Sequence, residues 1–336
     1  MDHSGLRAEG VGPPHGESLG SSLEPALIAE CDGRLSSIQW FRADWQHGGA
    51  STGLASWTTP EGRTIEVMVK IPVGPAEHRW TVRLGSIDPD RWDDGEGLPT
   101  PRILAAGTSL GQYDLGWLIV ERLAGRPIAA EKSKRAVQDL LSVAADFQAA
   151  AVRACPEIGP APETDWDRLL DSARRSATDN DLPESQRWRN QIRKVHRALP
   201  ALLERWNARP LDTWCHGDLH LGNAMRRRSG TGREPGACVL IDLALVHPGH
   251  WVEDAVYLER IYWGHPDGLH GIKPVAALAR ARRELGLGGS GDHAALANIR
   301  RVLTAACAPA FLAREGNPAY MAAALGIIER ILPQVA

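Results

Sequence analysis

The hydrophobic pattern of this chain changes character near Gly125, and that change limits the folds open to it. Before Gly125, apolar and polar residues alternate in short runs such as TIEVMVKI (64–71), with Gly, Pro and Asp between them. Beyond Gly125, segments such as 131–153 repeat apolar residues at helical spacing. The sequence therefore predicts an α+β protein, with a small antiparallel β-lobe followed by a larger, mainly helical lobe.

The domain boundaries follow from the same change. Residues 1–22 are rich in Gly, Ser, Pro and His without periodicity, which predicts a disordered leader. Residues 23–123 would form the β-lobe, with a turn at 60–62 and a short helix over 76–85. Residues 124–336 would form the helical lobe, with helices over 131–153, 184–208, 252–263, 274–285 and 293–314.

Composition excludes several classes of function. With 38 basic and 41 acidic residues, the chain has no charge excess that would favour a nucleic-acid partner. It has no apolar run of about 18 residues, and its start lacks the apolar core of a signal peptide. Its five cysteines are scattered and never spaced as C-x-x-C, which argues against a disulfide framework. These features predict a cytoplasmic protein without a membrane partner, and they do not indicate its oligomeric state.

The strongest motif is HGDLHLGN (216–223), followed by Asp242 at the end of the apolar run ACVLI (237–241). Phosphoryl transfer needs a carboxylate that positions the accepting hydroxyl and receives its proton. It also needs oxygen ligands for a magnesium ion on the nucleotide phosphates. Asp218 and Asn223 on one loop, with Asp242 at the end of a neighbouring strand, supply these groups.

These residues resemble two motifs of the aminoglycoside phosphotransferase and choline kinase family. HGDLHLGN matches the catalytic loop H-G-D-x-x-x-x-N, and LIDLALVHPGHWVED (240–254) matches the second motif, which begins I-D. The resemblance covers roughly residues 40–265 and implies a two-lobed protein-kinase-like fold that binds ATP and Mg²⁺ between its lobes. By resemblance, Asp218 would be the catalytic base and Asn223 and Asp242 the magnesium ligands.

The same resemblance implies further roles. His216 would structure the catalytic loop, and Asp254 would help to hold it. Lys70 would contact the nucleotide phosphates, with Glu77 as its ion-pair partner, and the segment around Glu121 and Leu123 would bind the adenine. A Gly-rich loop before them would cover the phosphates, and its candidate residues are Gly48, Gly49, Ser51 and Thr52.

Two other readings remain open at this point. His216, Asp218 and His220 alternate, and with Asp242, His247 and His250 they offer the ligands of a metal-dependent hydrolase. That reading leaves Lys70 and the Gly-rich loop unexplained. Alternatively, the chain could be a kinase-like protein that binds nucleotide without transferring phosphate, although such a protein would be expected to lack one of the catalytic carboxylates or the lysine.

The acceptor is not fixed by the sequence. Trp251, Trp263 and Glu259 follow the second motif and are the candidates for an acceptor pocket. Residues 255–336 contain six acids against nine Lys or Arg, whereas a polycationic aminoglycoside would require an acidic pocket. The segment 157–184 is richer in acids and could supply carboxylates. Sugars, amino sugars, amino alcohols and aminoglycosides all stay open as acceptors, and GTP stays open beside ATP.

Overall fold

The chain folds into two compact units, which are described separately. The computed structural model describes residues 19–41, 50–86, 97–123, 125–180, 182–227, 236–288, 292–312 and 316–336. The first unit comprises Met1–Gly74 and Leu104–Arg122, and the second comprises Pro75–Ile103 and Leu123–Ala336. None of the helices in the described ranges combines the length and apolar character that a membrane crossing requires.

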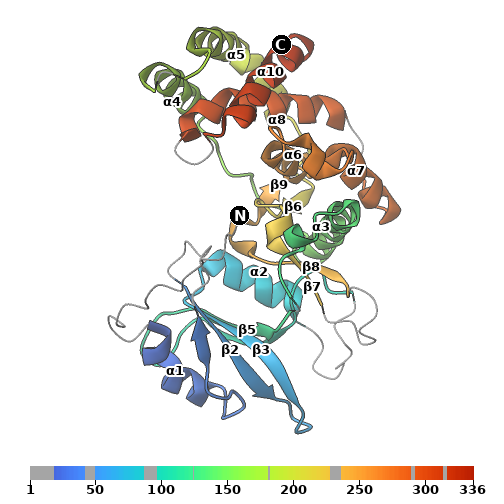
Figure 1. Ribbon diagram of the computed structural model, residues 1–336. Coiled ribbons are helices and arrows are strands. Elements are labelled where there is room, and N and C mark those ends of the chain that lie inside the picture. Colours follow the sequence, from blue (N-terminus) through green and yellow to red (C-terminus); the bar gives the residue numbers. More distant parts are fainter. Residues whose placement is uncertain are drawn as a thin grey trace, which may run out of the picture. The chain divides into compact units, whose positions relative to one another are not determined.

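The first unit is built on a five-stranded sheet with one helix, α1 (Leu19–Glu30), as Figure 1 shows. The strand order is β1-β2-β3-β5-β4, and the pairs β1–β2, β2–β3 and β3–β5 are antiparallel. The predicted hairpin with a turn at 60–62 is thus present. The strands are β1 (Gln39–Phe41), β2 (Ser51–Thr58), β3 (Thr64–Ile71), β4 (Ile103–Gly107) and β5 (Trp117–Glu121).

The two faces of strand β3 have different surroundings. Val67, Val69 and Ile71 are fully buried and share an apolar core with Leu27 of α1. Because side chains alternate along a strand, Lys70 points to the opposite face. Burial of one face in this way fixes the register of the strand, since a slip of one residue would expose the whole apolar set.

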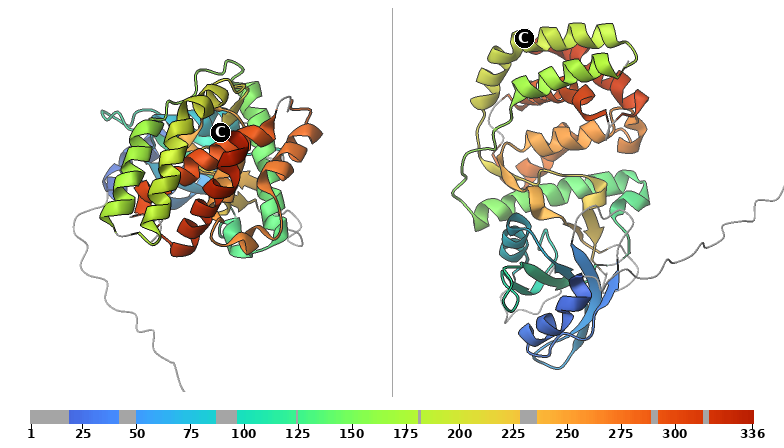
Figure 2. Two further views of the ribbon diagram at one scale, coloured as in Figure 1. Left: turned by 90° about the horizontal axis from the view of Figure 1, so that it is seen from above. Right: turned by 90° about the vertical axis from the view of Figure 1, so that its left-hand side faces the viewer.

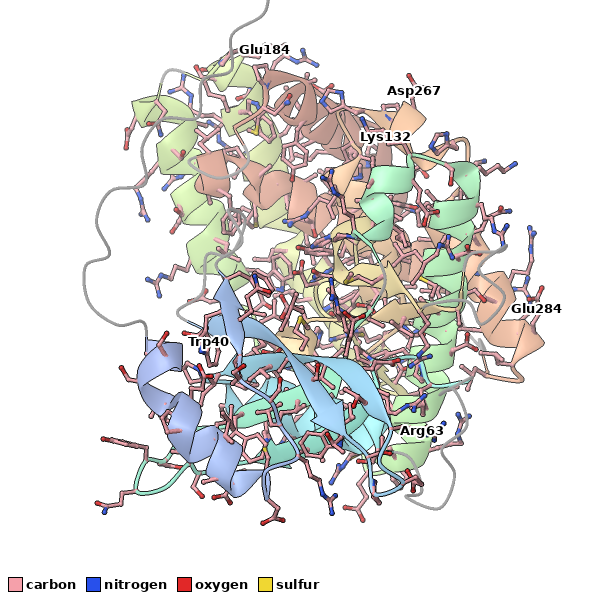
Figure 3. The ribbon with its side chains drawn as sticks, turned by 60° about the horizontal axis from the view of Figure 1, so that its bottom comes forward. Trp40, Arg63, Lys132, Glu184, Asp267 and Glu284 are labelled. Carbon is pink, nitrogen blue, oxygen red and sulfur yellow. The ribbon has the colours of Figure 1, made fainter. Side chains whose placement is uncertain are left out.

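Helix α1 begins at Leu19, inside the region predicted to be a disordered leader. Gly20 is buried, and a Cβ added to it would lie 2.7 Å from the ring of Trp40. The absence of a side chain therefore lets α1 pack closely on strand β1. Trp40, labelled in Figure 3, also donates its indole N–H to Glu24 Oε2 at 2.8 Å. The compositional bias of the leader hid this packing, and the prediction was wrong for residues 19–22.

The second unit is mainly helical, as predicted, and it contains two short two-stranded sheets, β6–β9 and β7–β8. Its strands are β6 (Thr213–Cys215), β7 (Ala224–Arg226), β8 (Cys238–Leu240) and β9 (His247–Gly249). Its helices are α2 (Pro75–Gly85), α3 (Lys134–Ala154), α4 (Trp166–Asp179), α5 (Ser185–Asn207), α6 (Val252–Ile261), α7 (Pro274–Glu284), α8 (His293–Cys307) and α10 (Pro318–Val335).

Side-chain caps set the starts of several helices. Ser133 Oγ accepts the amide of Ala136 at the start of α3, and Asp292 Oδ1 accepts the amide of Ala295 at the start of α8. Such caps satisfy backbone donors that have no partner in the first helical turn. The helix predicted over 293–314 ends early, at Cys307, and continues as a 3₁₀ turn over Ala308–Phe311. Pro309 lies in that turn and has no amide proton to continue the helix.

Two apolar clusters form the core of the second unit. The first joins α2, α3, α6 and α7 around the short strands, and the second joins α4, α5, α8 and α10. Figure 2 shows α4 and α5 lying beside α8 and α10 in the same unit. Helix α2 belongs here because Trp80 and Leu84 are buried in the first cluster, with the Trp80 ring 4.7 Å from that of Trp214. The contacts therefore group Pro75–Ile103 with the helical unit, whereas the predicted boundary keeps these residues in the β-lobe.

Candidate active site

The loop that carries the predicted base runs from the end of β6 to the start of β7. Gly217 in this loop has φ of +84°, and a Cβ there would lie 2.2 Å from the carbonyl oxygen of Leu245. Other residues are excluded by both the left-handed backbone and the close approach. The loop is therefore held tightly against the turn that follows Asp242.

Asp254 on helix α6 holds the start of this loop. Its Oδ2 accepts the backbone amide of His216, and its Oδ1 accepts that of Gly217, both at 3.0 Å. The side chain is 1% exposed. Two adjacent amides bound to one buried carboxylate fix the direction in which the loop leaves β6, because charge-assisted hydrogen bonds are short and directional.

A second layer of buried polar groups lies behind Asp254. Gln148 on α3 donates its Nε2 to Asp254 Oδ2 at 3.0 Å, and Arg282 on α7 donates to Gln148 Oε1 at 2.7 Å. Both side chains are buried. The chain of hydrogen bonds runs from α7 through α3 and α6 to the loop, so three helices together determine the position of the loop backbone.

His216 connects the loop to the strand that leads to Asp242. Its Nε2 donates to the carbonyl oxygen of Ile241 at 3.0 Å, and its Nδ1 accepts the amide of Asp218 at 3.3 Å. Burial lowers the pKa of His216, which opposes protonation of the ring. Both ring nitrogens are used within the protein, so His216 structures the loop and offers no lone pair to a metal ion.

Asp218 presents its carboxylate at the turn of the loop. Its Oδ2 accepts Asn223 Nδ2 at 2.8 Å and lies 3.5 Å from His220 Nε2, and its Oδ1 accepts the hydroxyl of Tyr257. The contact with His220, together with those from Tyr257 and Asn223, outweighs burial and holds the pKa of Asp218 well below its usual range. The same hydrogen bond and burial raise the pKa of Tyr257 to about 12. Asp218 is therefore ionised and oriented at neutral pH.

Asn223 and Asp242 are joined through the backbone. The amide of Ile241 donates to the carbonyl oxygen of Asn223 at 2.9 Å, which places Asp242 next to the end of the loop. Asn223 Nδ2 donates to Asp218, so its side-chain oxygen is left for another partner. Asp242 is exposed and has φ of +62°, an unusual conformation for a residue with a side chain. An amide oxygen beside a carboxylate fits Mg²⁺, which prefers oxygen ligands.

The histidines do not form the site of a metal-dependent hydrolase. His220 Nδ1 accepts the amide of Gly222, and His250 Nδ1 accepts that of Val252, so these nitrogens are also used within the protein. Among the described residues, the group of potential ligands that lies within 4.8 Å is instead Cys215, His247 and Glu253.

That group is not suited to a cation either. Burial raises the pKa of the Cys215 thiol well above its usual value, which disfavours the thiolate that binds metals. The carboxylate of Glu253 also lies 3.2 Å from Arg209 and 3.8 Å from Arg300. Two guanidinium groups already neutralise the carboxylate that a metal ion would need.

The predicted nucleotide residues of the first unit lie on β2, β3 and β5. Thr52 stands directly opposite Lys70 in the β2–β3 pair, and Leu118 stands opposite Lys70 in the β3–β5 pair. Ser51 begins β2 and Glu121 ends β5, while Gly48 and Gly49 lie outside the described residues. Leu123 is buried just after β5. Glu77 lies in the first turn of α2, in the other unit from Lys70.

Two of the predicted acceptor residues serve other contacts. Trp251 is 1% exposed, and its ring packs between His250 and His293, at 5.4 and 5.3 Å between ring centres. It is a core residue and cannot stack on a ligand, so that prediction was wrong. Trp263 stacks on Tyr320 at 5.8 Å.

The third predicted acceptor residue, Glu259, is also engaged. Its two carboxylate oxygens accept from Arg301 at 2.7 and 2.8 Å. The three predicted residues therefore do not form a common wall around an acceptor.

Sequence reasoning missed Tyr257, Gln148 and Arg282. Tyr257 lies three residues after Asp254 on α6, so both face the loop from one side of the helix. That spacing was a usable signal. Gln148 and Arg282 are far from the loop in sequence, and nothing local in their segments indicates a polar contact within the core.

Comparison with known proteins places this geometry in a family. No curated protein matches the sequence. An aminoglycoside phosphotransferase from Alicyclobacillus acidocaldarius has a similar structure, with a TM-score of 0.53, 15% identity and 98% of both chains covered. A spectinomycin phosphotransferase, APH(9)-Ia, in complex with ADP and spectinomycin gives a TM-score of 0.52 at 10% identity, covering 89% of this chain and 94% of that one.

A third similar structure is a thermostable mutant of the aminoglycoside phosphotransferase APH(4)-Ia, in a ternary complex with AMP-PNP and hygromycin B. It gives a TM-score of 0.50 at 16% identity, covering 94% of this chain and 99% of that one. These similarities establish the kinase-like fold. The model of the phosphotransferase enzyme family matches residues 74–316, a range that includes the whole catalytic loop and Asp242. The chain belongs to the phosphotransferase enzyme family.

Proposed function

We propose that this phosphotransferase moves the γ-phosphoryl group of ATP, with Mg²⁺, to a hydroxyl group of a small molecule. The observation that carries the proposal is the Asp218 carboxylate. It is ionised, oriented by Asn223 and Tyr257, and set on a loop whose backbone is bound by Asp254. A carboxylate with these properties is what the acceptor hydroxyl requires.

The reaction follows from the position of Asp218. The acceptor hydroxyl donates a hydrogen bond to the carboxylate, which orients the oxygen toward the γ-phosphorus. As the new P–O bond forms, the bond to the ADP oxygen breaks and the hydroxyl proton passes to Asp218. Because the pKa of Asp218 is low, it is a weak base, and it contributes mainly by orienting the acceptor.

Asn223 and Asp242 would hold Mg²⁺ through the side-chain oxygens described above. The ion neutralises charge on the phosphates, which is a large part of catalysis in phosphoryl transfer. The residues of the chain contribute the fixed backbone link between Asn223 and the strand end, which keeps both oxygens in place without reorganisation.

Lys70, with Thr52 beside it on the same face of the sheet, is the proposed contact to the nucleotide phosphates. Glu77 remains the proposed ion-pair partner of Lys70, and the segment from Glu121 to Leu123 the proposed adenine site. Structural relatives bound to AMP-PNP or ADP support an adenine nucleotide as donor. GTP is tested alongside ATP.

The test is ADP release from ATP and Mg²⁺ by the purified protein across sugars, polyols, amino alcohols and aminoglycosides. Asp218→Asn keeps the shape of the side chain but removes its charge, and Asp114→Asn, an exposed residue of the first unit, is the matched control. We expect acceptor-dependent turnover to fall by about 10²–10⁴ in the Asp218 variant. The control variant should retain it.

Other results would point elsewhere. Equal turnover in wild type and Asp218→Asn would remove Asp218 from the mechanism. Tight binding of ATP without transfer to any acceptor would support a protein that binds nucleotide but does not transfer phosphate. Binding is measured by isothermal titration calorimetry with AMP-PNP, and Lys70→Met should weaken it.

A further inference from the structure

Helix α6 is the element that contacts the reacting carboxylate. On Asp218, Oδ2 already accepts Asn223 at 2.8 Å and faces His220 at 3.5 Å, so its two lone pairs are directed at protein groups. On Oδ1 the structure shows one partner, the hydroxyl of Tyr257. The acceptor hydroxyl therefore binds at Oδ1, beside Tyr257, and α6 forms the adjoining wall of the acceptor site.

The carboxylates of α6 are already occupied. Asp254 binds the loop amides, as described above. Glu253 lies between Arg209 and Arg300, and Glu259 accepts a two-pronged hydrogen bond from Arg301 at 2.7 and 2.8 Å. Bidentate pairs of this kind are strong and fix both side chains. A positively charged acceptor would have to break one of these pairs to gain a carboxylate from the helix.

The wall beside Tyr257 instead carries positive charge. The guanidinium of Arg260, one turn further along α6, lies 4.9 Å from the centre of the Tyr257 ring. Two like charges at such a distance repel one another, and the repulsion is stronger where water is partly excluded. An ammonium group of the acceptor would therefore meet an unfavourable field next to its reacting hydroxyl.

The acidic segment 157–184 does not reverse this balance. On α4, Asp165 caps the helix by accepting the amide of Arg168 at 2.9 Å, and Asp167 pairs with His196 of α5 at 3.0 Å. Asp171 pairs with Arg174 of the same helix at 3.3 Å. These carboxylates, which the sequence offered as candidates for an acceptor pocket, are used within the α4–α5 pair.

We propose that the acceptor is an uncharged polyhydroxy compound, a neutral sugar or polyol, and not an amino sugar or aminoglycoside. This inference rests on the proposed function, because it concerns the molecule that Asp218 activates. Its basis is the charge around Tyr257: paired carboxylates on α6 and a guanidinium on the same face. Buried or partly buried ammonium groups require an unpaired carboxylate or they lose more hydration energy than they regain.

The experiment compares pairs of acceptors that differ in ammonium groups but share a ring: glucose with glucosamine, and myo-inositol with 2-deoxystreptamine. Hygromycin B is added as a larger polycation. Initial rates with ATP and Mg²⁺ give kcat/KM for each compound, and mass spectrometry identifies the phosphorylated product. We expect the neutral member of each reacting pair to have a kcat/KM at least about tenfold higher.

Charge-reversal variants test the cause. Arg260→Glu should lower the preference for the neutral member by about tenfold, because an attractive charge replaces a repulsive one. Arg197→Glu makes the same change at an exposed position of α5 and should leave the preference unaltered. Circular dichroism confirms that each variant is folded, and Arg260→Gln is used where the Glu variant is not. A preference for the amino compounds, or an unchanged preference in folded Arg260 variants, would overturn the proposal.

Failure of this inference can be distinguished from failure of the proposed function. Transfer to the amino compounds alone would keep the phosphotransferase assignment and remove the neutral acceptor. If no compound is phosphorylated, saturation-transfer NMR measures binding of the same pairs without turnover. Stronger binding of the amino members would contradict the charge argument, and stronger binding of the neutral members that Asp218→Asn weakens would uphold it.

Discussion

Two neighbouring residues of helix α6, Glu253 and Asp254, bury their carboxylates but stabilise them in opposite ways. Glu253 is surrounded by charged side chains: Arg209 at 3.2 Å, and Arg300 and His247 at 3.8 Å each. Burial alone would raise the pKa of Glu253, but these partners lower it to about 2. Its charge is compensated by other charges on three separate elements.

Asp254 is bound by neutral donors. The amides of His216 and Gly217 and the side-chain amide of Gln148 all donate to it at 3.0 Å. The nearest guanidinium in this network, that of Arg282, contacts Gln148 and not the carboxylate. Its charge is therefore held by oriented dipoles, two of which belong to the catalytic loop itself.

The difference separates stability from geometry. Ion pairs depend on distance and tolerate small displacements, whereas hydrogen bonds from backbone amides fix the atoms that donate them. We infer that Glu253 contributes mainly to the free energy of folding, and that Asp254 contributes mainly to the position of Asp218. Substitution of each residue in turn can break this comparison.

The largest effect is expected for Asp254→Ala. Removal of the carboxylate leaves three buried donors without their acceptor, at a cost of about 1–3 kcal/mol for each donor. Because the loop is released, kcat should fall by about 10² or more even in the folded fraction. Urea unfolding and steady-state kinetics measure the two effects. Asp254→Asn keeps one acceptor oxygen and should lie between Ala and wild type, and full activity in folded Asp254→Ala would contradict the comparison.

Glu253→Gln should show the opposite balance. It leaves Arg209 and Arg300 buried near a neutral group, and loss of one partner of a buried ion pair costs about 3–5 kcal/mol of stability. The loop contacts of Asp254 remain, so kcat at low temperature should stay within a few-fold of wild type. Differential scanning calorimetry and kinetics at 15–20 °C, as roughly chosen conditions well below unfolding, separate the two. Glu284→Gln, at the exposed position labelled in Figure 3, is the control.

The sequence predicted the parts of the molecule that carry local signals. The long amphipathic helix α3 and the hairpin of β2 and β3 have strong periodicity, and both are present near the predicted residues. Helix α4 was missed because charged residues dominate it, although its buried residues Trp166, Leu170, Ala173 and Ala177 are spaced helically. Helix α10 was missed because apolar residues surround it, which leaves little amphipathic contrast.

The candidate site divides in the same way. The loop residues are close in sequence, so the motif alone brings Asp218 near Asn223, and the structure shows them in contact. The groups that support the loop come from α3 and α7, far along the chain. Their hydrogen bonds depend on how helices pack, and a local pattern cannot predict which polar side chain a core will pair. The acceptor wall could not be predicted either, because charge counts do not show which carboxylates are already paired.

Acidification should separate the two carboxylates without a mutation. The pKa of Glu253 is lowered from 4.5 to about 2, so its contribution to stability is complete above pH 4.5 and is lost as the pH falls toward 2. That shift corresponds to about 3 kcal/mol at its limit. Unfolding free energies across this range should fall more steeply for wild type than for Glu253→Gln. Parallel curves would show that the arginines do not stabilise the ionised form.

Gln148→Leu should give the smallest effect and the sharpest test, because it removes the link between Arg282 and Asp254 and leaves both amide contacts of the loop intact. Stability should fall by about 1–3 kcal/mol, since the buried guanidinium loses an acceptor. If Gln148 also positions the loop, kcat should fall by several-fold while KM for ATP stays unchanged, and Gln148→Glu should not restore it, because a second carboxylate beside Asp254 repels the first. Gln186→Leu, at an exposed position of α5, controls for loss of an amide. A loss of stability with unchanged kcat would confine the role of Gln148 to folding, and the dipoles that matter for Asp218 would then be the loop amides alone.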